Sequence, residues 1–370
     1  MNLQKAFAEN LKNYRKRSGF TQKALASKLN YSDKAVGKWE SGKCIPPAEA
    51  LVKISKLLSV SVDDLLSVSS EPEYYLGING SALKTEFMLT DKSGRLLLEI
   101  AKGPSNPSAC GINEAKRILK EGINEVCSGV PLSGVAMFAG LSGCTTSDNQ
   151  AVFNSFFNTF SFASYGCGGD VENIIAIGLG KNDGVALIIG TGIIAYAVKD
   201  GVKKGIAGWG YLFDMGGSAY SFGRDAIYAA LCSEDGTGKQ TKLLSELTEL
   251  FGKKPSEALS DIYAGGMNKI AAAADAVFRA YEGGDSVAAE IIYKNCQEIS
   301  RIIETSCKTI GNRKTEVVIA GSMTKYGNII FPLIEKDLQG QGITIRTLSE
   351  RPVLGALLRA REEVKNSAKR

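Results

Sequence analysis

The feature that most constrains this chain is an abrupt change in its hydrophobic pattern near residue 70. Residues 1–67 show only the helical spacing of apolar side chains. From residue 74 onward, short apolar runs alternate with longer amphipathic segments, as strands alternate with helices in α/β proteins. The stretch SVSSEPE between them is small and polar and contains a proline, as linkers do. The sequence therefore predicts an all-α domain at 1–67, a linker at 68–73 and a separate α/β body.

Helix signals recur through the first domain. Leu3, Phe7, Leu11 and Tyr14 have helical spacing. Thr21 and Ser32 are of the residue types that cap helix N-termini, and a proline pair can open a helix. Beyond the first helix, the expected helices are 21–29, 32–40, 46–58 and 62–66.

Positive charge is concentrated in the same domain. Residues 1–67 carry 12 Lys or Arg and 6 Asp or Glu, whereas the other 303 residues carry 32 and 33. A basic helical module beside a nearly neutral body is typical of nucleic-acid-binding proteins. The charge pattern therefore favours DNA binding by the N-terminal domain.

The order TQKALASKLNYSDKAVGKWESGK places two short capped helices around a turn. It resembles the helix-turn-helix of the lambda-repressor (XRE/Cro/C1) family over residues 1–67. In such modules the second helix lies in the major groove with its N-terminal side chains on base edges. On that resemblance, the residues expected to bind DNA are Arg17, Gln22, Ser32, Asp33, Lys34 and Lys38, of which Arg17 and Gln22 would contact the backbone.

The expected partner is a double-stranded DNA operator. One such module makes few phosphate contacts, so a two-fold operator and a homodimer are expected. Gly37 departs from good helix chemistry inside the second helix and costs up to about 1 kcal/mol relative to Ala. We expect it to loosen this helix without abolishing it.

Composition excludes several kinds of catalytic site. The chain has no histidine, so no Ser-His-Asp triad, Cys-His pair or His-ligated metal is possible, and any general base must be a carboxylate. Its eight cysteines form no C-x-x-C pair, which argues against a zinc ribbon or a disulfide framework. They are expected to be reduced thiols, mostly buried. No long apolar run and no signal-peptide core occur, so a cytoplasmic protein without a membrane partner is expected.

The α/β body has three glycine-rich turns that directly follow predicted strands: GINGS near 77, IIGTGI near 189 and IAGSM near 319. Three such turns far apart in sequence suggest one cleft between two lobes. The lobes are expected at 74–185 and 186–350, with a C-terminal helix at 351–370 that returns to the first lobe. The predicted strands are 74–78, 85–90, 95–100, 134–139, 184–189, 193–198 and 316–320, and the predicted helices are 112–128, 148–159, 217–232, 240–251, 266–282 and 286–310.

Seven stretches of the body occur in the order of one known family. They are LGINGSALKT (76–85), GLSG (140–143), GGD (168–170), ALIIGTG (186–192), AGWGYLF…GGSAYSFGRDAI (207–227), IAGS (319–322) and PVLGALL (352–358). Together they resemble the BadF/BadG/BcrA/BcrD ATPase family, which includes N-acetylglucosamine kinases. The resemblance implies an actin-like ATPase (ribonuclease H-like) fold of two lobes. It also implies that ATP with Mg²⁺ and an amino sugar would meet between the lobes.

The same resemblance implies the residues of the site. The nucleotide-binding positions would be Asn79, Gly80, Lys84, Thr85, Gly190, Thr191, Gly192, Gly321 and Ser322. The sugar-binding positions would be Asp170, Gly208, Gly210 and Ser218.

Several positions depart from what phosphoryl transfer needs. The family's first loop runs approximately Asp-Gly-Gly-Gly-Thr-Lys-Thr, and here the Asp that organises Mg²⁺ is the neutral amide Asn79, with side chains at two of the glycines. The family's catalytic Asp is replaced by Thr145, a hydroxyl that is no base near pH 7. Asp148 is the nearest carboxylate and the candidate catalytic residue, although it can equally cap the helix that follows. No metal ligand is assigned.

Three hypotheses follow. The preferred one is a DNA-binding transcriptional regulator whose degenerate sugar-kinase-like domain senses a sugar or amino sugar, with ligand-driven lobe closure changing how two DNA modules are spaced. The alternative is an active ATP-dependent sugar kinase that carries a DNA module and uses Asp148 or Asp170 as base. The third is a protein held on DNA as an assembly partner, with an empty cleft.

Overall fold

The computed structural model describes residues 3–58, 60–66, 72–214, 216–311 and 314–369. Most of the predicted linker, 68–71, lies outside the described residues. The chain divides into two compact units, one of residues 1–173 and 352–370 and the other of residues 174–351. Within the described ranges, no helix combines the length and the apolar character that crossing a membrane requires.

The N-terminal domain is all-helical, as predicted. It consists of α1 (Leu3–Arg17), α2 (Gln22–Leu29), α3 (Asp33–Glu40), α4 (Ala48–Leu58) and α5 (Val62–Leu66). Thr21 and Ser32 cap α2 and α3 by accepting backbone N–H groups at 3.1 and 3.2 Å. Apolar side chains from all five helices form one small core.

The first lobe is built on a five-stranded sheet in the order β3-β2-β1-β4-β5. β1 (Tyr74–Gly80) pairs antiparallel with β2 (Thr85–Asp91), which pairs with β3 (Leu96–Lys102). On its other side β1 is parallel to β4 (Val135–Leu141), which is parallel to β5 (Ser164–Gly168). The carboxyl ends of β1, β4 and β5 therefore meet at one edge of the sheet, where α/β proteins bind ligands.

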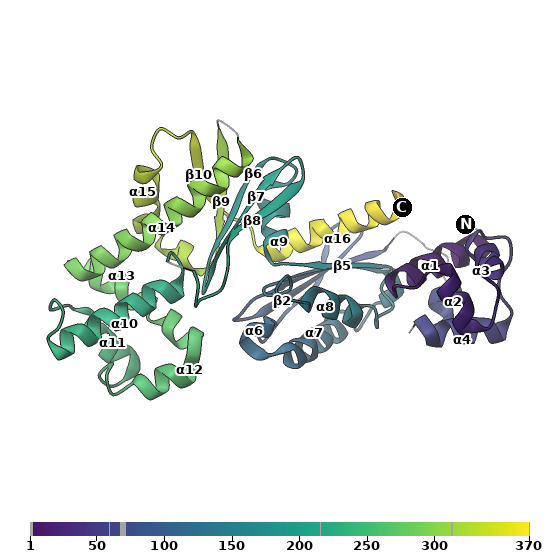
Figure 1. Ribbon diagram of the computed structural model, residues 1–370, viewed down its shortest axis with the longest axis horizontal. Coiled ribbons are helices and arrows are strands. Elements are labelled where there is room, and N and C mark those ends of the chain that lie inside the picture. Colours follow the sequence, from purple (N-terminus) through teal and green to yellow (C-terminus); the bar gives the residue numbers. More distant parts are fainter. Residues whose placement is uncertain (1–2, 59, 67–71, 215, 312–313, 370) are drawn as a thin grey trace. The chain divides into compact units, whose positions relative to one another are not determined.

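Helices cover both faces of this sheet (Figure 1). On one face lie α6 (Pro107–Cys110), α7 (Ile112–Val126) and α8 (Asn149–Phe157), whose apolar side chains pack with those of β1, β2 and β4. On the other face lies α16 (Pro352–Lys369), as predicted for the C-terminal helix. It packs very closely, since a Cβ on Gly77 would lie 2.7 Å from the carbonyl oxygen of Val353.

The second unit repeats this plan. Its sheet has the order β10-β9-β6-β7-β8, in which β6 (Gly184–Ile189), β7 (Ile193–Lys199) and β8 (Val202–Ala207) are antiparallel. β9 (Thr315–Ala320) and β10 (Ile343–Thr347) run parallel to β6. The sheet packs against helices, in one large core. These helices are α10 (Ala219–Asp235), α11 (Leu243–Phe251), α12 (Leu259–Ala272), α13 (Ala274–Glu282), α14 (Ser286–Ile310) and α15 (Gly327–Asp337).

Two predictions differ from this structure. The single helix predicted at 266–282 is wrong, because α12 ends at Ala272 and α13 begins at Ala274; Gly266, with φ 54°, kinks α12 at the start of the predicted span. The first unit ends at Asn173 instead of 185. The segment α9 (Val171–Ile174) and the following π-helical turn (Ile175–Leu179) lead into the second unit, where Gly178 packs against Val318 of β9.

Candidate functional site

The DNA-binding candidates lie on the exposed face of α3 and just before it. Ser32, Asp33, Lys34 and Lys38 are exposed, whereas Val36 and Trp39 on the opposite face are buried. Gly37 lies within the helix without breaking it. The helix therefore presents two ammonium groups and a carboxylate on one side, the arrangement that a recognition helix uses on base edges and phosphates.

Of the remaining two candidates, Gln22 begins α2 and Arg17 is the last residue of α1. Gln22 donates to Oε2 of Glu40 at 2.8 Å, and the same oxygen accepts from Nη2 of Arg15 at 2.9 Å. Gln22 is thus tied to an ion pair that joins α1 to α3. Arg17 ends α1, and its side chain lies outside the part that the structure describes.

The first glycine-rich turn, between β1 and β2, is closed by its own serine. The hydroxyl of Ser81 accepts the backbone N–H groups of Leu83 and Lys84, both at 3.2 Å, and donates to the carbonyl of Lys84 at 3.0 Å. Gly80 and Thr85 are buried, and the Thr85 hydroxyl donates to the carbonyl of Gly103 at 2.8 Å. Two amides that could face a phosphate are therefore already used inside the turn.

Asn79 lies at the end of β1 within a polar network. Its Oδ1 accepts from Nδ2 of Asn173 at 2.9 Å, and its own Nδ2 lies 3.5 Å from Oε2 of Glu86, the residue opposite it on β2. The ammonium of Lys84 pairs with the other oxygen of Glu86 at 2.9 Å. With an amide in place of the family's Asp and Lys84 engaged by Glu86, these residues do not fit a magnesium-bound triphosphate.

Asp170 lies at the carboxyl end of β5, beside the turn that follows β4. Its carboxylate accepts the N–H of Val171 at 3.1 Å and a hydrogen bond from Ser142. Burial raises the pKa of Asp170 to about 6 in spite of these hydrogen bonds. Thr145, at the position of the family's catalytic Asp, lies beside Gly169, the residue that precedes Asp170. A Cβ added to Gly169 would be 3.7 Å from the methyl carbon of Thr145. Asp170 and Thr145 are therefore brought together.

Asp148 stands at the N-cap position of α8, and its side chain makes no cap hydrogen bond there. It is exposed, and the preceding Ser147 has φ 51°, which turns the chain away before the helix starts. Among the described residues, the hydroxyl of Thr145 donates no hydrogen bond to this carboxylate. Of the two candidate bases, Asp170 has the environment that tunes a carboxylate toward neutral pH.

Two glycine-rich turns meet in the second unit, at the ends of the parallel neighbours β6 and β9. Gly321, with φ 109°, passes so close to the end of β6 that a Cβ there would lie 2.4 Å from the carbonyl of Ile189. Thr191 and the flanking Gly190 and Gly192 form the tight link from β6 to β7. A Cβ on either of these glycines would meet nothing within 4 Å, so this turn borders open space.

The sugar-binding candidates Gly208 and Gly210 lie in the loop after β8, which is held by hydrogen bonds to its own Asp214. Both oxygens of Asp214 accept backbone N–H groups, from Trp209 at 3.0 Å and from Gly210 at 3.1 Å. Gly208 and Gly210 have φ 77° and 96°, which such a turn requires. Asp214 thus shapes the loop rather than presenting both its oxygens outward, while Trp209 stays 78% exposed. A cavity of about 310 Å³ opens below, lined by Trp209, Phe213 and side chains of α14.

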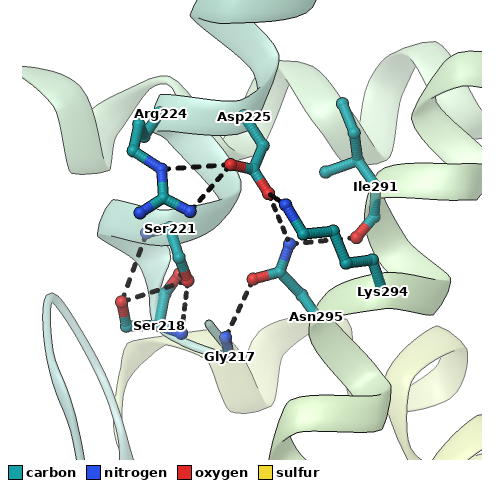
Figure 2. Close-up of polar contacts among 8 residues, drawn as sticks. All are labelled: Gly217, Ser218, Ser221, Arg224, Asp225, Ile291, Lys294 and Asn295. Atoms are coloured by element: carbon teal, nitrogen blue, oxygen red, sulfur yellow. Dashed lines mark hydrogen bonds and ion pairs between the residues drawn. The ribbon is translucent and has the colours of Figure 1, made fainter. Parts of the chain in front are cut away.

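Ser218 and its neighbours anchor this loop to the helices (Figure 2). Ser218 is buried and caps α10 reciprocally with Ser221, so its hydroxyl is engaged. The N–H of Gly217 donates to Oδ1 of Asn295 on α14 at 2.8 Å. The amide of Asn295 in turn reaches Asp225, which is paired with Lys294 at 2.9 Å. The loop, α10 and α14 are therefore held in one polar network.

Sequence reasoning missed several of these partners. Ser142 lay inside the quoted GLSG stretch, but only the structure shows its hydrogen bond to Asp170. Asn173, Glu86 and Asn295 belong to no quoted motif. No local sequence signal marks them, because each acts on a segment that is distant along the chain or across a strand pair.

Comparison with known proteins agrees with this division of the chain. Residues 76–360 match the sequence profile of the BadF/BadG/BcrA/BcrD ATPase family, and residues 11–65 match a helix-turn-helix profile. The HTH-type transcriptional activator BcrR of Enterococcus faecalis is 48% identical over 61 residues, which are 16% of this chain and 30% of the activator.

The larger, α/β part of this chain is similar to a sugar kinase. The N-acetylmuramic acid/N-acetylglucosamine kinase of Clostridium acetobutylicum is 28% identical over 303 residues, covering 79% of this chain and 99% of the kinase. Among solved structures, a candidate N-acetylglucosamine kinase from Chromobacterium violaceum superposes with a TM-score of 0.67 at 19% identity, covering 78% of this chain and 99% of that one. This likeness confirms the predicted two-lobed actin-like fold.

Proposed function

Because the chain belongs to the BadF/BadG/BcrA/BcrD ATPase family and carries a helix-turn-helix module, we propose that it is a transcriptional regulator whose kinase-like part binds a sugar without phosphorylating it. The protein joins a DNA-binding module to a sugar-kinase-like domain. The proposed ligand is an amino sugar such as N-acetylglucosamine or N-acetylmuramic acid, the sugars in the name of its clostridial relative. The proposed DNA partner is a two-fold operator bound by two copies of the chain.

The closed first turn is the observation that supports the proposed lack of phosphoryl transfer. Kinases of this kind work almost entirely by holding phosphates and metal in place. Here the hydroxyl of Ser81 takes the N–H groups of Leu83 and Lys84, and Glu86 takes the ammonium of Lys84. A turn that satisfies its own donors gives a triphosphate few to bind.

The residues proposed to bind the sugar retain more of the groups that this role needs. Asp170 and Ser142 form a hydrogen-bonded pair at the ends of β5 and β4, and hydroxyl and carboxylate groups are suited to binding sugar hydroxyls. The adjacent Thr145 adds a further hydroxyl where a kinase has its base. This arrangement supports binding of a sugar more than reaction of it.

The test is ADP release by the purified protein with Mg-ATP and a panel of sugars that includes both amino sugars, together with thermal unfolding in the same sugars. We expect no ADP above background, and a rise in the unfolding temperature with at least one sugar, because a ligand that binds only the folded state stabilises it. Absence of any sugar-dependent shift would contradict the sensing proposal and favour an assembly role on DNA.

One observation favours the alternative, an active sugar kinase. Burial holds the pKa of Asp170 at about 6, in the range that suits a general base. If ADP is released in a sugar-dependent way, Asp170→Asn and Asp148→Asn separate the candidate bases. Loss of turnover by orders of magnitude in one variant alone would make the protein a kinase and would identify its base.

Operator binding and its dependence on the sugar are tested separately. Selection from a random pool of DNA duplexes gives the preferred operator, and fluorescence anisotropy measures its affinity with and without the stabilising sugar. We expect the sugar to change the affinity, since a regulator requires a differential effect on its two states. A sugar that stabilises the protein yet leaves operator binding unaltered would contradict regulation while leaving sugar binding intact.

A further inference from the structure

A hydrogen bond joins the N-terminal domain to the first lobe within one compact unit. The hydroxyl of Ser161, in the loop between α8 and β5, donates to Oδ2 of Asp64 in α5 at 3.0 Å, although the two residues are 97 positions apart along the chain. The Asp64 residue is only 9% exposed. A carboxylate shielded from water needs donors, and hydrogen bonds to carboxylates are stronger than those between neutral groups. The contact is therefore a specific attachment between the two domains.

In the N-terminal domain the same carboxylate holds α5 in place. Oδ2 of Asp64 also accepts the N–H and the hydroxyl of Ser61, at 2.9 and 2.6 Å. Nδ2 of Asn10 on α1 donates to the carbonyl of Asp64 at 3.1 Å, which ties α5 to α1. The ion pair of Arg15 with Glu40 ties α1 to α3. Ser161 is thereby connected, through α5 and α1, to the helix that carries the DNA-binding candidates.

In the first lobe the loop of Ser161 is packed into the core on both sides. The rings of Phe160 and Phe162 stack with centroids 5.5 Å apart, and Phe162 is buried among the side chains of the sheet and its helices. The N–H of Ala163 donates to the carbonyl of Val135, at the start of β4, at 2.9 Å. β5 begins at the next residue and ends at the turn of the candidate sugar site. The loop is therefore rigidly joined to β5.

We propose that the contact of Ser161 with Asp64 transmits sugar binding to the DNA-binding helices. A sugar bonded to Asp170 acts on one end of β5, and the Ser161 loop at the other end positions α5. Energetic coupling between distant sites passes through packed side chains and hydrogen bonds that join rigid elements, and this contact is such a link. Ser161 and Asp64 are positioning residues. The proposal rests on the proposed function for its sugar and its operator, whereas the attachment itself does not.

The attachment is tested first, without sugar or DNA. The chain has two tryptophans, Trp39 in the core of the N-terminal domain and the exposed Trp209 in the second unit. In the full-length Trp209→Phe protein, urea unfolding followed by tryptophan fluorescence therefore reports the N-terminal domain. We expect Ser161→Ala to lower the midpoint of this transition, because the Asp64 carboxylate loses a donor. An unchanged midpoint would overturn the attachment.

Two further variants separate this contact from a general effect on the lobe. Thr159→Ala removes a hydroxyl of the same loop, which donates to the carbonyl of Phe156 at 2.7 Å, and is expected to leave the Trp39 midpoint in place. Asp64→Ala and Ser161→Ala combined are expected to lower the midpoint by less than the sum of the two single changes, since both remove one contact. Additive effects, or an equal loss in Thr159→Ala, would overturn a direct link.

The transmission is tested by fluorescence anisotropy on the selected operator, with and without N-acetylglucosamine or N-acetylmuramic acid, whichever raises the unfolding temperature. We expect the sugar to change the operator Kd of the parent and of Thr159→Ala. In Ser161→Ala the change is expected to fall below about twofold while the sugar still binds, because coupling is a free energy separate from either affinity.

The outcomes of this second test differ for the two proposals. A sugar effect on operator binding that survives in full in Ser161→Ala would overturn the transmission and leave the proposed regulation standing. No sugar effect in the parent would overturn the proposed regulation and the transmission together. Loss of sugar binding in Ser161→Ala would place Ser161 in the support of the sugar site and would also overturn its role as a link.

Discussion

Asn173 donates its side-chain amide to Oδ1 of Asn79 at 2.9 Å, and this contact fixes which way the Asn79 amide points. Its Nδ2 then faces Oε2 of Glu86 across the strand pair, at 3.5 Å. Asn79 thus joins a donor on one side to an acceptor on the other, a role that an aspartate at this position could not fill. The neutral residue is part of a consistent network and not only a lost metal ligand.

Replacing Asn79 by Asp places two carboxylates opposite each other on β1 and β2. Like charges directly opposite in a strand pair are unfavourable, so Asn79→Asp is expected to lower the unfolding temperature in EDTA. Two adjacent carboxylates can also coordinate a hard cation. Mg²⁺ is therefore expected to restore the lost stability. The measurement is thermal unfolding with EDTA and with Mg²⁺, with the exposed Asn154→Asp change on α8 as control. Equal unfolding temperatures in the two buffers would contradict this expectation.

Removing the Ser81 hydroxyl frees two backbone N–H groups of the first turn. Ser81→Gly is expected to bind Mg-ATP more tightly, by about fivefold if one freed N–H contributes about 1 kcal/mol to a phosphate contact. Isothermal titration calorimetry measures this. The matched control is Ser93→Gly in the β2–β3 hairpin, where the hydroxyl donates to Asp91 at 2.6 Å. A gain in both variants, or in neither, would show that the Ser81 hydroxyl does not block the turn.

Lys34 is exposed near the N-terminus of α3 and is the expected partner of a base edge. Lys34→Ala is expected to weaken binding of the selected operator by about 1–3 kcal/mol, roughly 5- to 150-fold, and to reduce discrimination at one base pair. Anisotropy with operator variants measures both effects. Lys53→Ala, an equally exposed lysine on α4, is the control and should change little. Equal weakening on all sequences would instead identify Lys34 as a phosphate contact.

The raised pKa of Asp170 predicts a pH-dependent stability. Since the folded protein holds this proton up to about pH 6 and the unfolded chain releases it near pH 4, the contribution of Asp170 to the unfolding free energy falls as the pH rises between these values. Asp170→Asn removes this dependence. Its stability relative to the parent protein is therefore expected to increase from pH 4 to pH 7, by on the order of 2 kcal/mol.

Urea unfolding at several pH values in this range checks that expectation. Asp91→Asn is the control, because the hydrogen bond from Ser93 lowers the pKa of the Asp91 carboxyl. The ionised form of Asp91 favours the folded state, so its variant should lose stability relative to the parent as the pH rises. A parallel course for both variants would contradict the buried state of Asp170.

Local chemistry explains which parts of the fold the sequence predicts well. The helix caps at Thr21 and Ser32 act within three residues, so residue type alone marks them, and the order of the glycine-rich stretches marks both lobes. The strands β5, β8 and β10 were not predicted. β5 contains two glycines and β8 carries two lysines on a sheet edge, so neither shows the apolar alternation that indicates a strand.

The site was harder to predict, because its chemistry depends on contacts across space. The sequence shows only that a side chain, that of Ser81, stands at one of the glycine positions of the family's first loop, whereas the structure shows that its hydroxyl closes the turn. Asp214 accepts the N–H groups of its own loop, a role that no local sequence signal marks.

The contact between Gly217 and Asn295 has a consequence for motion. A glycine amide in a surface loop normally exchanges its hydrogen with solvent within seconds to minutes, but this one is buried and bonded to the middle of a 25-residue helix. Its exchange then requires α14 to separate from the loop, so it should be as slow as the exchange of core amides in β6. In a deuterium-exchange experiment the loop after β8 would therefore be fast at the exposed Leu212 and slow from Gly217 onward, with the change located at the glycine pair that precedes α10.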